Sequence, residues 1–139
     1  MNTIILIACS SKKLPHKSKA KDLYNSTLFK KSLKYALSLN FNKIFILSAK
    51  YGLLELNAYI SSYNKTLNKM NSSQIQKWSN TVLNQLKKVA DLKNDKFIFL
   101  AGNNYRKFLI SYIEHYKIPM QSLSIGKQLH WLSKNIKYE

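Results

Sequence analysis

The first residues that could carry chemistry form the segment CSSKK, residues 9–13. Two small polar side chains, Cys9 and Ser10, open it, and two cations, Lys12 and Lys13, close it. If a turn or a helix follows, its free backbone amides and these lysines form an anion site. The G-x-x-x-x-G-K-[ST] motif of nucleotide-hydrolysing phosphate loops is absent. Cys9 is either a nucleophile activated by the lysines or, more commonly for a cysteine that ends an apolar strand, a small buried hydrophobe.

The segment SAKYGLLE, residues 48–55, brings three other kinds of group together. Lys50 could contact a phosphate, Tyr51 could stack on a base, and Glu55 could transfer a proton or balance a charge. The alternatives are that Tyr51 packs in the core at the edge of a sheet and that Glu55 is a solvated loop acid. The combination indicates a nucleotide-binding segment.

Two polar stretches supply further candidates. Asp22 precedes an amphipathic helix, where its charge also suits the positive end of that helix. Tyr63 and Asn64 lie in residues 54–73, a stretch without clear periodicity, and loops that long in a compact domain are usually functional. We therefore count Asp22, Tyr63 and Asn64 as candidate site residues.

The three histidines and the single cysteine do not indicate a metal site. His16, His115 and His130 lack metal-ligand spacing, and one cysteine excludes both a multi-cysteine zinc site and an internal disulfide framework. His115 falls opposite the apolar stripe of its predicted helix and is expected at the surface, whereas His130 is expected near the candidate site. We expect neither a metal nor a cofactor.

Alternating strands and helices must position these residues. Four runs of apolar, β-favouring residues predict strands, the last of them the weakest, at residues 3–9, 43–48, 96–101 and 121–125. Apolar residues at three- and four-residue steps predict helices at residues 28–37, 75–89, 105–116 and 129–136. Asn25 or Ser26 is the expected N-cap of the first helix. This alternation predicts an α/β fold with a parallel four-stranded sheet and right-handed crossovers.

Each of the three glycines, Gly52, Gly102 and Gly126, follows a predicted strand. Glycine suits such positions because a tight turn or a close ligand leaves no room for a Cβ atom. Ligands of open parallel sheets bind outside the carboxyl ends of the strands. We therefore expect four loops to face one cleft, at residues 9–13, 48–52, 102–104 and 126–127. The alternative is that the glycines only form ordinary turns.

The charge balance indicates a polyanionic partner. The 139 residues include 23 Lys and Arg against 6 Asp and Glu, a formal net charge of +17. This excess argues against an acidic interaction module and favours DNA. The alternative is a generally basic surface with no nucleic-acid role. Because Arg106 is the only arginine, we expect few bidentate guanine contacts and weak sequence readout of duplex DNA.

Length and hydropathy predict one domain, residues 1–139. The apolar residues 4–8 are too few for a membrane span, and the lysines follow them rather than precede them, unlike a secretory signal. We expect a cytoplasmic protein with no membrane partner and no obligate protein partner.

Five motifs in a fixed order resemble a known family: IACSSKK, DLYNSTLFKK, ILSAKYGLL, YNKTL and LAGNNY. Between about residues 3 and 106 the chain resembles a family of small bacterial and phage domains that are distantly similar to the YaaA proteins and to the N-terminal domain of archaeosine synthase. The resemblance implies the uracil-DNA glycosylase superfamily, a three-layer α/β/α sandwich with a four-stranded parallel sheet and an active site at the strand carboxyl ends. The nearest activity it suggests is that of an anti-phage DNA glycosylase that removes glucosylated hydroxymethylcytosine.

The resemblance also implies roles for individual residues. The loop after the first strand would contact the sugar-phosphate and the base through Cys9, Ser10 and Lys13. Asp22 and Tyr24 would lie beside that loop. Across the pocket and along its wall the resemblance places Lys50, Tyr51, Gly52, Tyr63 and Asn64.

The chain departs from the family pattern near Asn64. Many relatives carry Asp at that position, and an acid–proline pair where this chain has Ser61 and Ser62. Asn64 would therefore orient a water molecule rather than act as a general base. We expect the catalytic residues to be Asp22, Glu55 and Asn64.

The leading hypothesis is a DNA glycosylase that acts on a modified base. Cleavage of the N-glycosidic bond passes through an oxocarbenium-like sugar, and lysines, amides or His130 would hold the charge of the departing base. The base must leave the stack, so an aromatic partner such as Tyr24 or Tyr51 is expected. A variant of this reaction uses a lysine amine and nicks the strand through a Schiff base.

Two other classes of function remain open. One is a non-enzymatic DNA-binding protein of the YaaA kind, with a steep salt dependence. The other is an enzyme on free nucleosides, a nucleoside hydrolase or a deoxyribosyltransferase, for which the net charge of +17 is unnecessary.

Overall fold

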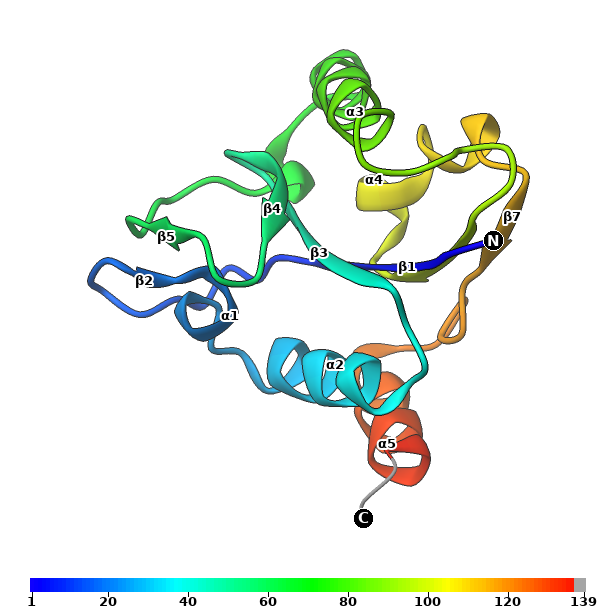
Figure 1. Cartoon of the computed structure of the whole chain (residues 1–139). Coiled ribbons are helices and arrows are strands. Elements are labelled where there is room, and N and C mark those ends of the chain that lie inside the picture. The colour runs from blue at the N-terminus through cyan, green and yellow to red at the C-terminus, as the bar shows by residue number, and fades with distance from the viewer. Residues whose placement is uncertain (137–139) are drawn as a thin grey trace.

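A computed structural model describes residues 1–136 and has a mixed α/β fold around a five-stranded, mostly parallel sheet (Figure 1). The strands of this sheet, in spatial order, are β4 (Gly52–Glu55), β3 (Lys43–Ser48), β1 (Thr3–Ala8), β6 (Lys96–Leu100) and β7 (His115–Lys117). A second sheet consists of β2 (Ser18–Lys19) and β5 (Tyr59–Ile60). The helices are α1 (Ala20–Leu23), α2 (Thr27–Ser38), α3 (Ser72–Leu86), α4 (Asn103–Arg106) and α5 (Ile125–Asn135). Short 3₁₀ turns cover Leu67–Lys69 and Ile110–Tyr112.

Strand β1 is the centre of the sheet because its side chains are apolar on both faces. Ile4, Ile5, Leu6 and Ile7 are at most 1% exposed. The strand pairs in parallel with both β3 and β6. Each such aliphatic side chain contributes about 1.5–3 kcal/mol when it is fully buried.

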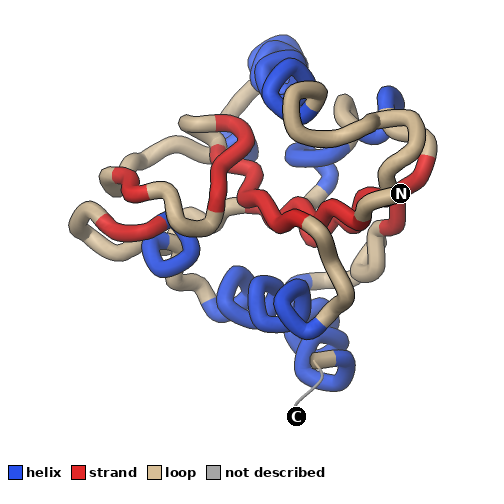
Figure 2. Tube along the Cα trace, in the orientation of Figure 1, coloured by secondary structure: helices blue, strands red, loops and turns tan. Residues whose placement is uncertain are grey.

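Alternate side chains of the sheet pack under helices on its two faces. Ile4 and Leu6 share a core with α3, where Trp78 is the largest contributor. Ile5 and Ile7 share the other core with α2 and α5. Figure 1 shows α3 and α4 on one side of the sheet and α2 and α5 on the other, and Figure 2 shows the strands between these helices. The period-two alternation of β1 thus builds two cores from one strand.

Local capping signals place the helix starts. The Ser26 side chain accepts a hydrogen bond from the Phe29 amide, so Ser26 rather than Asn25 is the N-cap of α2. Asn71 and Gln74 form a reciprocal capping box at the start of α3. The strands expected at residues 3–9, 43–48 and 96–101 are confirmed within one residue at each end.

The expected strand at residues 121–125 is wrong, and the fourth parallel strand is β7. Ser122 has a φ of 68°, which interrupts an extended strand, and Ile125 begins α5. All three residues of β7 are exposed, so the strand has no apolar pattern and exists because it pairs with β6. The helix expected at residues 105–116 is correspondingly limited to α4 and a 3₁₀ turn.

Two glycines illustrate how the strand ends differ. Gly52 begins β4 at a φ of 74°, where an added Cβ would collide with the side chain of Gln85. Gly126 lies in the first turn of α5 and does not follow a strand, which corrects the expectation for that glycine. The sheet also has an antiparallel edge strand, β4, which the sequence pattern did not indicate.

Candidate functional site

The connection from β1 to β3 and the connection from β4 to β6 cross opposite faces of the sheet. The chain reaches β3 through α2 on one face, and it reaches β6 through α3 on the other face. The carboxyl ends of β1 and β6 therefore flank a topological switch point, where open α/β sheets bind ligands. A cleft of about 810 Å³ lies at this place.

The cleft has an apolar floor and a polar wall. Phe29, Phe99 and Met120 are among its apolar lining residues, and each is almost fully buried. The polar lining side chains come from the loop after β1, the first part of α2, the 3₁₀ turn Leu67–Lys69, the segment after β6 and the residues before and within α5: Cys9, Ser10, Ser11, Lys12, Ser26, Thr27, Ser32, Asn68, Asn103, Arg106, Gln121, Ser122 and Gln128.

The cleft carries positive charge without a balancing acid. Lys12 and Arg106 are its cationic lining side chains, and no carboxylate or histidine lines it within residues 1–136. The N-terminal residues of α2, with 12 residues, and of α5, with 11 residues, also reach the wall. Helix N-termini add partial positive charge. The cleft therefore suits an anionic ligand.

Several wall residues are held by hydrogen bonds to the backbone. An Arg106 guanidinium nitrogen donates to the Ala101 carbonyl at 2.6 Å. Burial lowers the pKa of Arg106, but an arginine remains charged at neutral pH. The Ser10 hydroxyl donates to the Lys12 carbonyl at 2.7 Å, and the Gln128 amide donates to the Leu123 carbonyl at 2.9 Å. These bonds fix the wall before a ligand binds.

On the other side of β1, at the carboxyl end of β3, lies a tyrosine cluster that consists of Tyr24, Tyr63, Tyr51, Ser48 and Lys13. The hydroxyls of Tyr24 and Tyr63 are 2.6 Å apart, and those of Tyr63 and Ser48 are 2.8 Å apart. The Lys13 ammonium lies 4.4 Å from the centre of the Tyr63 ring, and the Tyr51 ring packs edge-on against Tyr63 at 5.7 Å. The hydroxyls of Tyr24, Tyr63 and Ser48 are thus joined by hydrogen bonds through Tyr63.

Burial raises the pKa values of two tyrosines in the cluster and lowers the pKa of its lysine. Burial raises the pKa of Tyr24 to about 12 and also raises the pKa of Tyr63. It lowers the pKa of Lys13, partly offset by the nearby Cys9. The phenols of Tyr24 and Tyr63 are neutral at physiological pH, so they act as fixed hydrogen-bonding groups rather than as acids or bases.

Cys9 lies between the cleft and the tyrosine cluster. It lines the cleft, and its thiol donates to the Tyr105 hydroxyl at 3.6 Å. The same hydroxyl accepts a hydrogen bond from the Leu67 amide at 3.3 Å. Cys9 is half-buried, and this contact joins the loop after β1 to α4.

The structure separates the residues that the sequence assigned to one site. The cleft wall contains Cys9, Ser10, Lys12, Gly102, Asn103 and Arg106. The second group, which includes the exposed Lys50 beside the Tyr51 ring, lies in or next to the tyrosine cluster: Lys13, Tyr24, Lys50, Tyr51, Gly52 and Tyr63. One continuous loop, residues 9–13, contributes to both groups. The expectation that all four loops face one cleft therefore holds for the loops at 9–13 and 102–104 and not for those at 48–52 and 126–127.

The remaining candidates lie outside the cleft wall. Asp22 and Asn64 are exposed, and neither lines the cleft. Glu55 is exposed, and because β4 runs antiparallel to β3 it lies opposite Phe45, away from the carboxyl edge. His130 lies on an exposed position of α5, whereas Gln128 and Leu129 line the cleft.

Tyr24 requires a specific correction. Its side chain is 0% exposed, with its ring 5.3 Å from that of Phe29. It offers no open face to an extruded base. It serves instead to link the start of α2 to Tyr63.

Sequence reasoning missed the amides of the wall. Gln121 falls in the expected fourth strand, and Gln128 precedes the expected last helix. Asn68, whose side-chain oxygen accepts a hydrogen bond from the Asn104 amide at 3.0 Å, lies in the aperiodic stretch. The sequence indicated Ser26 only as one of two candidate N-caps, beside Asn25, and not as a wall residue.

Within residues 1–136, His, Cys, Asp and Glu side chains do not gather in threes at metal-binding distances. In the same part of the chain, no helix combines the length and the apolar character needed to cross a membrane.

Comparisons with known proteins identify a family. The sequence model of a family of unknown function, DUF6884, matches residues 4–134. No curated protein and no solved structure matches the chain.

Proposed function

We propose that this chain, which belongs to the DUF6884 family, is a DNA glycosylase that hydrolyses the N-glycosidic bond of a modified base in the cleft between β1 and β6. The observation that carries the proposal is the cleft at the switch point, with Lys12 and Arg106 on its wall and no carboxylate there within residues 1–136. Such a wall attracts phosphates and the negative charge of a departing base.

The net charge supports DNA rather than a free nucleoside as the substrate. A free nucleoside carries no phosphate, and binding it would not need a net charge of +17. A DNA strand presents a phosphate on each side of the nucleotide in the cleft. Lys12, which is exposed on the cleft rim, is placed to contact one of them.

The apolar floor supports extrusion of the base. A base that is stacked and paired inside a duplex cannot enter the cleft, whose volume is about 810 Å³. The nucleotide must therefore leave the stack. Ile125, which lines the cleft and is 66% exposed, can replace part of the lost stacking with apolar contact, whereas Phe29 and Phe99 are at most 2% exposed. Gln121 and Gln128 supply amide groups that can hydrogen bond to the edge of the base.

The reaction itself needs few groups. The bond between C1′ and the base nitrogen breaks, and its electron pair leaves with the base. Water adds to the oxocarbenium-like sugar, and the proton that this water loses neutralises the departed base. Because Asp22 and Glu55 lie outside the cleft wall, the DNA phosphates would stabilise the sugar cation. Asn103 is the wall residue best suited to orient the water, the role that the sequence assigned to Asn64.

The finer assignment rests on the sequence resemblance. Helices on both faces of the sheet support the three-layer sandwich of the uracil-DNA glycosylase superfamily, here with a five-stranded sheet. The volume, about 810 Å³, is near the upper end of the roughly 300–1,000 Å³ typical of ligand pockets. It has room for a base that carries a sugar, as glucosylated hydroxymethylcytosine does.

The direct test is release of the base. The protein is incubated with DNA that contains glucosylated hydroxymethylcytosine, hydroxymethylcytosine or unmodified cytosine. Mass spectrometry of the released bases, together with a count of abasic sites, should show product from a modified DNA only. Absence of any released base across a panel of phage genomes would overturn the proposal.

A non-enzymatic DNA-binding protein is the second candidate. The observation that favours it is the lack of a carboxylate or a histidine on the cleft wall within residues 1–136. It predicts salt-dependent DNA binding with DNA recovered unchanged. The base-release assay and a binding assay on the same preparation separate the two candidates.

A further inference from the structure

The β2–β5 ribbon extends from the carboxyl side of the sheet. Ser18 pairs with Ile60 and Lys19 pairs with Tyr59 in antiparallel register. Figure 1 shows the ribbon beyond the end of β1, on the side opposite β7. Ser18 and Ile60 are buried, at 7% and 8% exposed, so one face of the ribbon is anchored to the body.

Further backbone bonds make this ribbon a defined arm. The Ala20 amide donates to the Ala58 carbonyl at 2.7 Å, and the Lys21 amide donates to the Leu56 carbonyl at 2.9 Å. The arm therefore continues the pairing past its two-residue strands. Segments about 40 residues apart in the sequence are joined here without a connecting hairpin turn.

The outer face of the arm carries an exposed aromatic ring beside cations. Tyr59 is 63% exposed, and the Lys17 ammonium lies 5.2 Å from the centre of its ring. Lys19 lies directly across from Tyr59. An aromatic ring that stacks on any base, next to cations that contact the backbone, is the arrangement by which proteins bind nucleic-acid strands without sequence preference.

The charge of the arm and its supporting loops has one sign. Residues 12–21 contain five lysines and no carboxylate, and residues 56–70 contain Lys65 and Lys69 and again no carboxylate. The nearest acids in the sequence, Asp22 and Glu55, lie just outside these two segments. A polyanionic strand is the complementary partner.

The base of the arm is also the rim of the cleft. Lys12 lines the cleft, and its carbonyl accepts a hydrogen bond from the Asn25 amide at 3.1 Å. Lys13 forms a bridge to Tyr24 that closes the excursion of residues 14–23. From Lys12 to Lys17 an extended chain reaches at most about 18 Å, the rise of roughly five nucleotides along one strand.

We propose that this arm binds the DNA strand that flanks the nucleotide in the cleft, with Tyr59 stacked on a base and Lys17 and Lys19 on phosphates. The proposal rests on the proposed function for its partner, DNA, and adds a strand-binding surface outside the cleft. The arm holds the strand within about five nucleotides of the extruded base.

The test measures DNA affinity by fluorescence anisotropy with labelled single-stranded and duplex oligonucleotides. Tyr59→Ala is expected to weaken binding of the single strand about tenfold, whereas Tyr59→Phe keeps the ring and should bind like the wild type. A Lys17→Gln and Lys19→Gln double variant is expected to lower the slope of log affinity against log salt by about 1.5–2.

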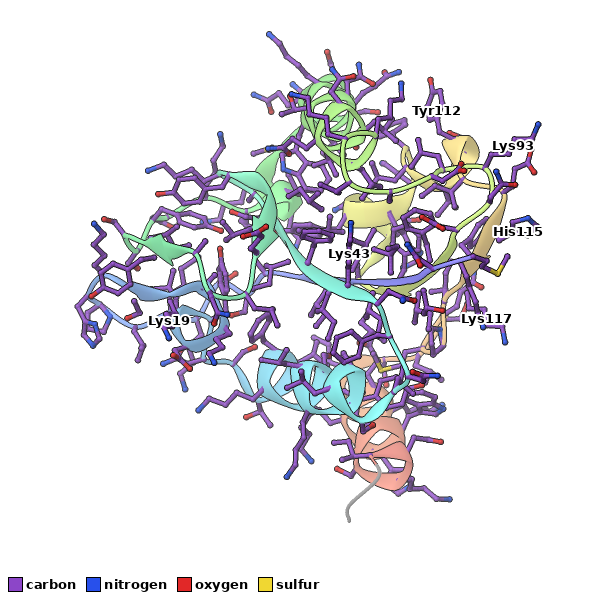
Figure 3. The ribbon with its side chains drawn as sticks, viewed as in Figure 1. Lys19, Lys43, Lys93, Tyr112, His115 and Lys117 are labelled. Carbon is purple, nitrogen blue, oxygen red and sulfur yellow. The ribbon has the colours of Figure 1, made fainter. Side chains whose placement is uncertain are left out.

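Matched controls come from the opposite side of the molecule. Tyr112 is 60% exposed, close to the value for Tyr59, and Lys93 and Lys117 are exposed. Figure 3 shows these three residues on the side away from Lys19. Tyr112→Ala and a Lys93→Gln and Lys117→Gln double variant should change affinity less than twofold. Equal losses of DNA affinity in the control and arm variants would contradict the proposed role of the arm and would indicate general charge attraction alone.

The same variants separate the arm from the glycosylase. If the arm variants lose DNA affinity while the wild type releases no base from any DNA, the DNA-binding role of the arm is supported and the glycosylase proposal is contradicted. If Tyr59→Ala binds DNA and releases base like the wild type, the DNA-binding role of the arm is contradicted and the glycosylase proposal is supported. Failure of the wild type to bind DNA overturns both.

Discussion

The carboxyl end of β1 divides two regions of contrasting chemistry. Toward β6 lies the cleft, an open volume whose wall carries Lys12 and Arg106. Toward β3 lies the tyrosine cluster, where the hydroxyls of Tyr24, Tyr63 and Ser48 hydrogen bond to one another. Both regions begin in the same loop, residues 9–13.

The difference shows that polar residues at a strand end can serve either the ligand or the fold. A buried polar group needs a partner, and in the cluster that partner is another side chain of the protein. On the cleft wall the exposed Lys12 and Asn103 face solvent that a ligand can displace. Substitutions in the two regions should therefore separate stability from binding.

The largest effect is expected in the cluster. Tyr24→Ala should lower the free energy of unfolding by about 3–5 kcal/mol, because it empties a fully buried ring position and removes the bond to Tyr63. Denaturant unfolding followed by circular dichroism measures this change. Tyr59→Ala, at an exposed position, should stay within about 0.5 kcal/mol of the wild type. A loss below about 1 kcal/mol for Tyr24→Ala would contradict the structural role.

A substitution that fills the cleft should leave stability unchanged and reduce base release. An added Cβ at Gly102 meets no atom within 4 Å, and its φ of −65° suits any residue. Gly102→Phe should therefore leave the free energy of unfolding within about 0.5 kcal/mol of the wild type. Under the proposed function, base release should fall at least about 100-fold, because the ring would occupy the space proposed for the extruded nucleotide.

Gly126 supplies the control for this substitution. It also has open space around an added Cβ, but it does not line the cleft. Gly126→Phe should keep both stability and base release. Loss of base release in both variants would place the active region elsewhere on this edge of the sheet.

Alkaline pH should reduce the contribution of the tyrosine cluster to the free energy of unfolding, and comparison with Tyr24→Phe measures that reduction. The pKa of Tyr24 is raised to about 12 in the folded protein, so its stabilising contribution is complete below the unfolded pKa of about 10 and is lost as the pH rises through 12. The expected loss is on the order of 2 kcal/mol. The contribution of Lys13 to stability changes with pH in the opposite direction. Its pKa is lowered in the folded protein, so its deprotonation favours the folded state.

Comparison of the wild type with Tyr24→Phe isolates this effect. The difference in free energy of unfolding between the two proteins should shrink between pH 10 and pH 12. Urea unfolding at fixed ionic strength gives both values. A difference independent of pH would show that Tyr24 ionises equally in both states.

The smallest effect is expected from a single cation of the cleft wall. Arg106→Gln should lower the slope of log affinity against log salt by about 1 if the guanidinium contacts one phosphate. It also removes the bond to the Ala101 carbonyl, which should cost about 0.5–1.5 kcal/mol of stability. Anisotropy titrations at several salt concentrations measure the slope, and an unchanged slope would remove Arg106 from the phosphate contacts.

The elements of the fold that depend on local pattern were accessible from the sequence. The apolar runs at β1, β3 and β6 and the start of α2 near residues 25 and 26 need only neighbouring residues to explain them, and the structure then chose Ser26 over Asn25 as the N-cap. The cleft residues after β1 and β6 followed from the rule that ligands bind at strand carboxyl ends.

Features that depend on distant partners were not accessible. β7 is a strand only because its exposed residues pair with β6. The buried Tyr24 hydroxyl finds its hydrogen-bond partner in Tyr63, 39 residues away, at 2.6 Å. A residue type states which bonds a side chain can form, but not which partner the folded chain brings within reach. The sequence determined the central strands and the polar character of their ends, and the tertiary structure decided which polar groups bond to each other and which are left for a ligand.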